Sequence, residues 1–484
     1  MQVGLLTGFQ SSRETRLPVP FFAFLLVWIG FSVASIALEE HTEMDSTSVV
    51  DPLSQMTTTT LSNGLTVLTL PDSSTPVVSF QIWVQAGSVD ETNFTGIAHL
   101  FEHMMFRGSK SLPPEAHSRL IEARGGRVNA FTSRDVTVYH AEVSRENLPL
   151  VIALESERLH NLDISKSSLA SERQVVLEER RLRTEDSPTG RAFEALFAQV
   201  FQAHSYRHPT IGWRSDIENV EVEHCQEFFE TFYAPNNLVI SIAGDFDEEE
   251  TLSLVQKYFA GLSRRRPPVR TPRKEPEQTG PRRAEVIFPV RSSLIAVGWS
   301  APRAGHSDGP ALDVASEILS GGRSSRLYRR LVYEEEIALS ANGYYWELSQ
   351  GGVFYAFVRV RPGASVVLTE SVFFEEIEKI SSLEVSEKEL KKAKRNLEVA
   401  LLKGHTTSHS LAQRMGSEVI TFGRVRPLAE RLQAVRAVTA EDVRRVAINY
   451  LAKTRSSTVN VIAPDLHSQI LKSNPASNLQ SPSQ

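Results

Sequence analysis

The chain of 484 residues repeats one succession of elements: each half ends with an amphipathic helix, a tyrosine, a hydrophobic strand and an aspartate. The first copy reads CQEFFETFYAPNNLVISIAGD and includes Tyr233 and Asp245; the second reads VRRVAINYLAKTRSSTVNVIAPD and includes Tyr450 and Asp465. Such a repeat indicates one structural unit that is used twice. The sequence therefore predicts the α+β class, with a duplicated unit of roughly 200 residues in which helices pack on an antiparallel-rich mixed sheet.

Hydrophobic residues that alternate with a period of two indicate strands, and spacings of three and four indicate helices. In the first half, strands are expected on both sides of the turn Asn63-Gly64, over 78–84, over 135–143 and over 236–245. Helices are expected around the sequence GIAHLFEHMM, over 117–126 with Leu120, Ile121 and Ala123 inward, and over 146–182 with a break at 163–168. In the second half, strands are expected over 285–290, 292–300 and 352–360, a helix over 309–322, and further helices up to residue 450, one capped by Thr439.

The length of the chain and a break in hydrophobic periodicity define the expected domains. Residues 263–283, SRRRPPVRTPRKEPEQTGPRR, are rich in proline and arginine and are expected to form an exposed linker. Its positive side chains either are simply solvated or form a binding site for an anionic partner. The expected division is 1–38 signal peptide or anchor, 39–55 linker, 56–262 first repeat, 263–283 linker, 284–465 second repeat and 466–484 disordered tail.

An uncharged segment near the N-terminus indicates export. Residues 17–38 contain no charged side chain and follow two arginines, and Ser35 and Ala37 fit the −3 and −1 positions of a cleavage site. The segment is also long enough to span a bilayer if it is not cleaved. Either outcome exports the rest of the chain. The expected location is a bacterial periplasm, with anchoring to the inner membrane as the alternative.

The composition restricts the chemistry that is available. A net charge of −6 and a pI near 6.2 argue against a nucleic-acid partner, which needs a basic face. The chain has one cysteine, Cys225, so it can form neither an intrachain disulfide nor a cysteine-based metal cluster. Any metal ion must therefore be held by histidine, aspartate or glutamate.

The sequence His99-Leu-Phe-Glu102-His103 has the spacing of a metal site. Residues four apart lie on one helix face, so both imidazoles can face one ion. A catalytic zinc needs three protein ligands and an open position, and Glu102 is placed to act as a general base beside it. The simpler alternative is two histidines on an ordinary amphipathic helix. The small and apolar flanking residues indicate a buried helix, in which polar side chains need partners or an ion.

A third ligand must come from elsewhere, and the stretch SERQVVLEERRLR, residues 171–183, offers candidates. Glu172 and Glu179 are seven residues apart and share one helix face, whereas Glu178 lies on another face. A charged surface helix with no ligand is the alternative interpretation.

These motifs resemble those of the pitrilysin, or insulinase, family of zinc peptidases, the inverzincins, in which the order is His-x-x-Glu-His. The chain is most similar to the half-length bacterial members and to the beta subunit of the mitochondrial processing peptidase. In the family, a glutamate ligand follows the motif after about 75 residues, with another glutamate seven before it; here 75 residues separate His103 from Glu179, and Glu172 precedes it. The resemblance implies one Zn²⁺ per chain bound by His99, His103 and Glu179, with Glu102 as base and Glu172 as a supporting carboxylate. It makes 56–262 the zinc-binding peptidase domain and 284–465 its homologue.

The resemblance extends to the stretch GGRVNAFTSRDVTVYH and to YAPNNLVISIAGDFD and SGGRSSRLYRRL. In the family, the first of these is an edge strand that pairs with the substrate backbone. This implies that Asn129, Ala130, Phe131 and Thr132 contact a peptide by strand addition. A purely structural strand is the alternative.

The second half departs from the family pattern. Family members usually carry an arginine and a tyrosine seven residues apart that support the oxyanion. Here Val332 and Leu339 stand at those positions, and Tyr333 and Tyr344 are out of register. The departure leads to the hypothesis of a heterodimer in which a homologous zinc-less subunit supplies the pair; a homodimer is the alternative.

The resulting expectation is a zinc endopeptidase that cleaves short or unfolded peptides inside a clam-like chamber. The alternatives are a non-catalytic structural or assembly subunit of the same family and a purely structural metal site. Cys225, His117, His140 and His160 are expected to be packing or surface residues rather than ligands, because three protein ligands are already assigned.

Overall fold

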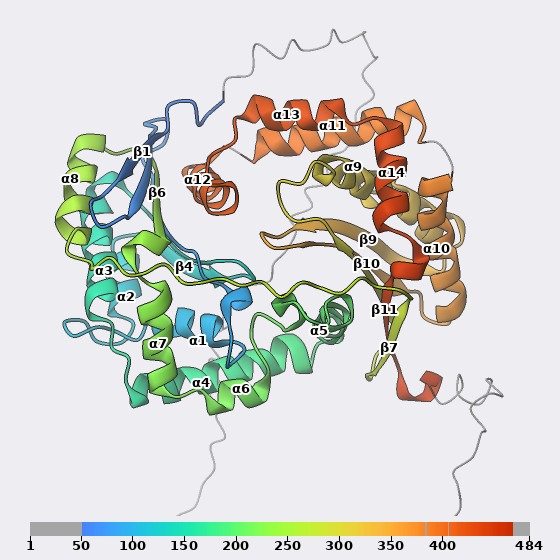
Figure 1. The fold of residues 1–484 in the computed structure, drawn as a ribbon, viewed down its shortest axis with the longest axis horizontal. Helices are drawn as coiled ribbons and strands as arrows, with labels where there is room; N and C mark the ends of the chain where they lie inside the picture. Colours follow the sequence, from blue (N-terminus) through green and yellow to red (C-terminus); the bar gives the residue numbers. More distant parts are fainter. Residues whose placement is uncertain (1–50, 383–384, 405, 468–484) are drawn as a thin grey trace, which may run out of the picture. The chain divides into compact units, whose positions relative to one another are not determined.

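The computed structural model describes residues 51–382, 385–404 and 406–467. The expected signal peptide and residues 468–484 of the expected tail lie outside these ranges, whereas residues 466 and 467 are helical. Figure 1 shows two sheets, each accompanied by helices. The first sheet contains β1 (Thr57–Thr60), β2 (Thr66–Pro71), β3 (Val78–Val84), β4 (Arg127–Thr132), β5 (Thr137–Val143) and β6 (Leu238–Gly244). The second contains β7 (Arg282–Ile287), β8 (Leu294–Ala301), β9 (Ala338–Glu347), β10 (Gly352–Val360) and β11 (Ser457–Ile462).

The two sheets have the same strand plan. The first has the order β1-β2-β6-β3-β5-β4 and the second has the order β7-β11-β8-β10-β9. In each sheet one pair is parallel, β2 with β6 and β7 with β11, and the remaining pairs of the shared plan are antiparallel. The predicted duplication is therefore confirmed. The repeat-ending strands β6 and β11 occupy equivalent positions, beside the parallel partner.

Among the described residues, six helices of each repeat follow the same order, and the first repeat has two additional helices. The first repeat has α1 (Ile97–Met104), α2 (Ala116–Glu122), α3 (Leu148–Asn161), α4 (Lys166–Arg180), α5 (Pro188–Val200), α6 (Arg214–Asn219), α7 (Val222–Phe232) and α8 (Glu248–Phe259). The second has α9 (Gly309–Ser320), α10 (Val366–Ser382), α11 (Glu387–Lys403), α12 (Ser408–Phe422), α13 (Leu428–Ala437) and α14 (Ala440–Tyr450), and Thr439 caps α14 as expected. No helix in the described ranges has both the length and the hydrophobicity needed to cross a bilayer.

One helix of each repeat packs on the sheet of the other repeat. Helix α12 packs on β3 and β6 of the first sheet, and α5 packs on β8 and β11 of the second (Figure 1). These are equivalent strands, and each helix is the one that follows the long helix α11 or α4. Hydrogen bonds support the first contact, since Ser241 Oγ donates to the carbonyl of Ala412 over 2.7 Å. Both repeats belong to one compact unit.

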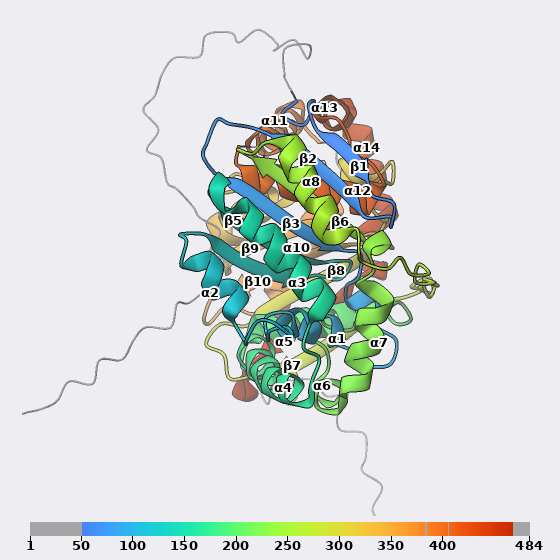
Figure 2. The same cartoon turned by 90° about the vertical axis from the view of Figure 1, so that its left-hand side faces the viewer.

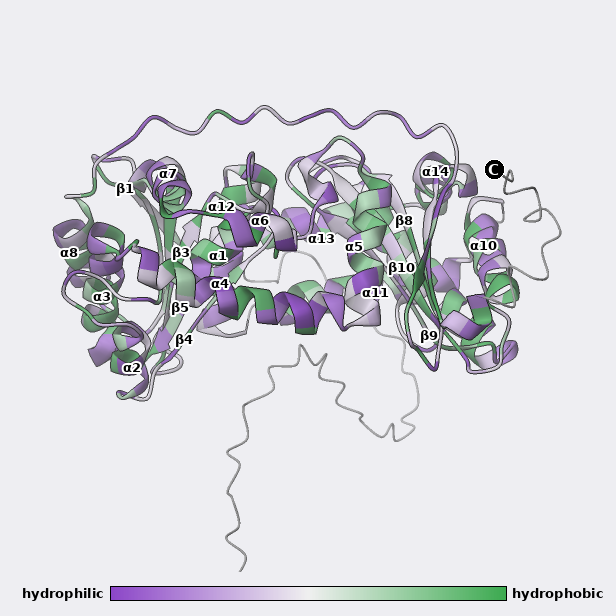
Figure 3. Cartoon of the chain, turned by 90° about the horizontal axis from the view of Figure 1, so that it is seen from below, coloured by the Kyte–Doolittle hydropathy of each residue, from purple (hydrophilic) through white to green (hydrophobic). Residues whose placement is uncertain are grey.

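Hydrophobic residues occupy both faces of the first sheet. Figure 2 shows helices α3, α7 and α8 over one face of this sheet, and Figure 3 shows the hydrophobic colour of many strand residues. One face of the first sheet packs on α1, α3 and α7 through residues such as Phe80 and Ile240. The other face packs on α12 through Trp83 and Met415. Strands β3 and β6 are buried along their whole length and carry hydrophobic residues on both faces, with Ser79, Gln81 and Ser241 as buried polar exceptions.

Several expectations are wrong in detail. Ala123 is exposed, because α2 ends at Glu122 and buries Ala116, His117 and Ile121 instead. Strand β7 begins at Arg282, inside the expected linker, and ends before Pro289, which has no N–H for a ladder. Strand β9 was not predicted, because its polar residues and Gly343 weaken the strand pattern.

The segment 263–281 contains no helix or strand, as expected of a linker, but it does not lie free. Arg270 forms an ion pair with Asp90, 2.7 Å apart, and its side chain is 27% exposed. The carboxylate of Glu275 accepts hydrogen bonds from the backbone N–H groups of residues 202–204. Part of the charge of this segment therefore serves contacts within the chain.

Candidate metal centre

Helix α1 starts at a close approach between two loops. Gly96 precedes the helix with a φ of 87°, and a Cβ atom there would lie 2.4 Å from the carbonyl oxygen of Ile211. A Cβ atom on Gly212 would lie 2.5 Å from the Cα of Gly96. The buried carboxylate of Glu91 accepts hydrogen bonds from the N–H groups of Gly96 and Ala98, over 2.8 and 3.0 Å. A carboxylate is favourable at this end of a helix, so the position of α1 is well defined.

The structure brings His99, His103 and Glu179 together between α1 and α4. One ligand atom from each lies within 4.8 Å of the others. Glu179 Oε2 lies 3.7 Å from His99 Nε2 and 3.3 Å from His103 Nε2, and these side chains are 12–22% exposed. Two imidazoles and one carboxylate are a ligand set that zinc accepts in peptidases.

The alternative glutamates on α4 have other partners. Glu172 Oε2 lies 3.1 Å from His103 Nδ1, and Glu172 also pairs with Arg107. Glu172 is therefore placed to orient the ring of His103 from behind, as an outer carboxylate does at many metal sites. Glu178 instead forms an exposed ion pair with Arg181 over 2.7 Å, away from the histidines.

Glu102 lies beside this group but is not part of it. Its side chain is buried, at 8% exposure for the residue, and Thr132 Oγ1 donates a hydrogen bond to its Oε2 over 2.6 Å. Burial raises the pKa of Glu102 to about 7, although the hydrogen bond from Thr132 opposes the shift. A carboxyl group with such a pKa can both accept and donate a proton near neutral pH.

The pKa values around the candidate ligands show where positive charge is stabilised. Burial alone would lower the pKa of His103, but its hydrogen bonds to Glu172 and Glu179 outweigh burial and raise it to about 9. Burial lowers the pKa of His99 to about 4, so this ring is neutral and keeps a free lone pair. The buried Nδ1 of His99 has no hydrogen-bond partner in the described chain. The arrangement therefore favours positive charge at His103, and a metal cation that takes the place of its proton would lie between the two rings and the carboxylate.

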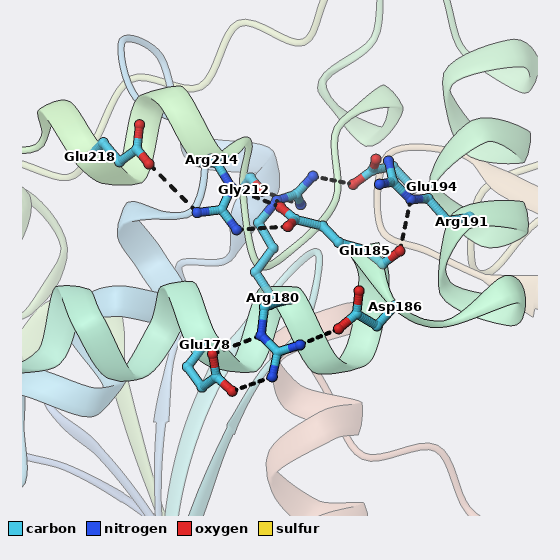
Figure 4. Close-up of polar contacts among 10 residues, drawn as sticks. Glu178, Arg180, Glu185, Asp186, Arg191, Glu194, Gly212, Arg214 and Glu218 are labelled. Atoms are coloured by element: carbon cyan, nitrogen blue, oxygen red, sulfur yellow. Dashed lines mark hydrogen bonds and ion pairs between the residues drawn. The ribbon is translucent and has the colours of Figure 1, made fainter. Parts of the chain in front are cut away.

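An arginine-rich network holds the C-terminal end of α4, which carries Glu179 (Figure 4). The buried Arg180 donates to the carbonyl of Gly212 over 2.6 Å and pairs with Glu194 over 2.8 Å and Glu185 over 3.3 Å. A π-helical turn, Arg181–Glu185, follows directly; such turns recur near functional sites. Because Gly212 touches Gly96, this network joins the ends of the two helices that supply the candidate ligands.

Strand β4 forms the edge of the first sheet and carries the four residues expected to contact a peptide. The four divide between its faces. Ala130 and Thr132 lie on the side of α1, where Thr132 bonds Glu102. Phe131 lies on the opposite side, where it packs on Trp83, and Asn129 lies on that side opposite His140.

The second repeat adds no polar side chain at the two positions where the family carries its arginine and tyrosine. Val332 lies in a π-helical segment, Tyr328–Glu334, and packs on the second core. Leu339 on β9 is 46% exposed, and Tyr333 and Tyr344 are also exposed.

Three residues that the sequence interpretation omitted support the site: Arg107, Arg183 and Glu91. Arg183 Nη1 lies 2.6 Å from Glu179 Oε1. Both arginines stand four residues after a candidate ligand, His103 or Glu179, and that spacing was a usable signal. Glu91 had no such signal, because its partners are backbone groups.

Three of the residues expected to be outside the site have partners elsewhere. Cys225 is buried, and burial raises the pKa of its thiol to about 12. His117 lies 3.1 Å from Glu155, and His160 Nδ1 lies 2.9 Å from the carbonyl oxygen of Ser156. His140 differs, because it faces His409 of α12.

Comparisons with known proteins match both repeats. Residues 66–213 match the family described as Insulinase (Peptidase family M16), and residues 219–397 match Peptidase M16 inactive domain. Zinc protease PqqE of Helicobacter pylori is 30% identical over 83% of this chain and 91% of its own length. The probable mitochondrial-processing peptidase subunit beta of Arabidopsis thaliana is 29% identical over 81% of this chain and 76% of its length.

A solved structure agrees with these matches. A protease from Helicobacter pylori superposes with a TM-score of 0.81 at 30% identity, and the match covers 86% of this chain and all of that chain. The two-domain α+β fold expected from the sequence is thereby confirmed.

Proposed function

The chain belongs to the insulinase family of peptidases, family M16, and we propose that it is a zinc-dependent endopeptidase. The observation that carries the proposal is Glu102: a buried carboxyl group with a pKa raised to about 7 by burial, next to two histidines and a glutamate within 4.8 Å of one another. A metal site that serves structure alone has no need of an adjacent base.

His99, His103 and Glu179 would hold the zinc ion. Their donor set and the unpartnered His99 nitrogen fit such an ion. When bound, zinc supplies Lewis acidity that polarises a carbonyl group and makes water more acidic. Glu172 and Arg107 keep the ring of His103 oriented from the far side.

Glu102 performs the proton transfers. It takes a proton from the attacking water and later delivers a proton to the nitrogen of the departing amine, so that the peptide C–N bond breaks with the charges balanced. The hydrogen bond from Thr132 holds its Oε2 and fixes the orientation of the carboxyl group. The raised pKa suits both directions of transfer.

The substrate is a short or unfolded peptide. Only an extended segment can add a strand to the edge of the sheet at β4. The N–H of Ala130 donates to Asn129 Oδ1 over 2.9 Å, and a peptide that pairs with this group would replace that bond. Thr132 joins this edge to the base, so a paired peptide lies next to Glu102. In the clam-like chamber expected for the family, folded proteins are excluded by size.

Val332 and Leu339 support the further proposal of a heterodimer. Neither side chain can donate a hydrogen bond to a developing oxyanion. A homologous, zinc-less subunit that carries an arginine and a tyrosine would complete the site. The uncharged segment 17–38 supports export to a bacterial periplasm as the place of action.

The test is cleavage of an unstructured peptide by the purified, zinc-loaded chain, with Glu102→Gln as the blank. Cleavage that disappears in the blank is the expected result. Absence of cleavage in every form, including mixtures with an arginine- and tyrosine-bearing subunit, would contradict the peptidase and favour a structural role.

The heterodimer has a separate test within this chain. The double substitution Val332→Arg with Leu339→Tyr is expected to raise cleavage by the lone chain by about 10-fold, because it restores donors for the oxyanion. Leu339→Phe, which adds an aromatic ring without a hydroxyl group, is the matched control. Full activity of the unaltered chain as a homodimer would contradict the need for a second subunit.

A further inference from the structure

A second group of candidate ligands lies where the two repeats meet. His140 and Glu142 on β5 and His409 near the start of α12 each place one ligand atom within 4.8 Å of the others. Because His140 and Glu142 are two residues apart on a strand, both point to the face on which α12 packs. His409 Nδ1 lies 3.5 Å from Glu142 Oε1.

The two histidine pairs of the molecule have nearly the same geometry. The rings of His140 and His409 have centroids 4.8 Å apart and an interplanar angle of 66°. The rings of His99 and His103 in the candidate metal centre have centroids 4.9 Å apart and an angle of 68°. In both places one carboxylate accompanies the two rings. The donor set of the second group therefore matches that of the first.

The surroundings leave the ring of His140 available, whereas Nδ1 of His409 also lies 3.5 Å from Gln81 Nε2. The ring of His140 forms no hydrogen bond to the described part of the chain. Burial and, to a smaller extent, the nearby His409 lower its pKa to about 4, so the imidazole is neutral and can donate a lone pair. Arg127, opposite Glu142 on β4, is exposed and forms no ion pair with it among the described residues.

The framework that carries the donors is rigid. Gln81 on β3 is buried and lies opposite His140 in the sheet, and its Nε2 donates to the carbonyl oxygen of His409 over 3.1 Å. Ser408 Oγ donates to the carbonyl oxygen of Val77 over 3.2 Å, which fixes the first turn of α12 on the same sheet. The side chains of His409 and Glu142 are nevertheless 30% and 35% exposed, so an ion can reach them from solvent.

We propose that His140, Glu142 and His409 form a second divalent-cation site, of the zinc class, distinct from the candidate centre at His99 and His103. Two imidazoles and a carboxylate suit zinc and neighbouring transition metals better than magnesium or calcium, which prefer oxygen ligands. A cation there would connect β5 of the first repeat to α12 of the second. It would thus stabilise the exchange of helices that holds the repeats together. Among the residues that the structure describes, no base comparable to Glu102 stands beside it, so its role is structural or regulatory.

The experiment measures zinc bound per chain after metal removal and reloading, in the full chain and in variants. The unaltered chain is expected to bind two ions, Glu179→Gln one, His409→Gln one, and the double variant none. The thermal midpoint of the Glu179→Gln chain should rise on addition of zinc, and this rise should disappear when His409→Gln is added. His160→Gln, whose ring bonds within its own helix, is the control and should leave stoichiometry unchanged.

His140→Gln provides an independent test if His409→Gln weakens the packing of α12, because its ring lies on the strand side of the site. Visible absorption of cobalt bound to the Glu179→Gln chain reports the ligands directly and should be lost in both variants. A Glu179→Gln chain that binds no zinc, or a His409→Gln chain that binds as much as the unaltered chain, would overturn the proposal. Neither readout depends on peptide cleavage, so failure of the proposed activity leaves the site testable.

Discussion

Helices α1 and α9 follow equivalent strands, β3 and β8, yet they present different side chains to their neighbours. Helix α1 turns two histidines and a buried glutamate toward α4 and β4. Helix α9 contains no histidine, buries leucine, valine and alanine, and meets α11 through Glu317, which accepts a hydrogen bond from Asn396 over 2.6 Å. The strand plan is the same in both repeats, so it does not depend on the polar site.

The residues before α1 and α9 also have different partners in the two repeats. Glu91 bonds the first backbone N–H groups of α1, whereas Asp308 beside α9 bonds Arg445 over 2.6 Å and Tyr450 over 2.8 Å. The repeat partner of Tyr450, Tyr233, instead bonds the hydroxyl of Tyr139 over 2.7 Å. Duplicated topology therefore leaves polar contacts free to diverge, and among the described residues it is the first repeat that carries the group of His99, His103 and Glu179.

The largest effect is expected at the third ligand. Glu179→Gln should lower zinc affinity by more than the roughly 10–100-fold typical of outer carboxylates, and peptide cleavage should fall with it. Equilibrium dialysis and cleavage assays measure the two effects. Glu178→Gln, one residue away and paired with Arg181 in solvent, should change neither. Equal effects of the two substitutions would contradict the assignment.

The exchanged helices offer a matched pair of substitutions. A Cβ atom on Gly416 of α12 would lie 2.2 Å from the ring of Trp83, and one on Gly298 of β8 would lie 2.9 Å from Val200 of α5. Gly416→Ala should lower the free energy of unfolding by about 3 kcal/mol and Gly298→Ala by about 1 kcal/mol, because Trp83 is fixed by a hydrogen bond to Gln81 while an aliphatic chain can shift. Denaturant unfolding measures both.

Helix propensity gives the opposite expectation for the first of these substitutions. Alanine in place of a helical glycine normally stabilises by about 1 kcal/mol. A stabilised Gly416→Ala chain would therefore show that α12 does not pack closely on Trp83.

Substitution of Glu172 measures how much the carboxylate behind the ring of His103 contributes to metal affinity. Glu172→Gln keeps the shape but removes the charge that faces His103, so zinc affinity is expected to fall by about 10–100-fold. Arg107→Gln should act through the same contact, and the double variant should show less than the sum of the two effects. Metal titration is the measurement, and additive effects would show that the two residues act independently.

The smallest effect is the pH dependence of stability that His208 contributes in the first repeat. Burial lowers the pKa of His208 from 6.5 to about 4, so between these values the unfolded chain binds more protons than the folded chain. Stability contributed by this group is complete above pH 6.5 and is lost as pH falls, by up to about 2 kcal/mol at pH 5.

Unfolding curves at pH 7 and pH 5 measure this dependence. His208→Gln should reduce the loss between the two pH values. A loss of equal size in the unaltered chain and in His208→Gln would contradict the role of His208.

The local pattern of the sequence was enough to predict most secondary-structure elements and the duplication of this protein. Strand and helix periods, the turn at Asn63-Gly64 and the repeat of Tyr233 and Tyr450 are properties of neighbouring residues, and they led to the duplicated α+β fold. The four-residue spacing of His99 and His103 placed two donors on one face for the same reason. The spacing to Glu179 was informative only together with the family resemblance.

Other features were decided by the tertiary structure alone, because they join residues far apart in the chain. No local signal states that α5 and α12 cross to the opposite sheets, that Thr132 bonds Glu102, or that the raised pKa of Glu102 follows from burial. His140 and His409 are 269 positions apart, and only the packing of α12 on the first sheet makes them neighbours. The sequence by itself determined the elements and one helical ligand pair; packing decided which distant side chains share a site.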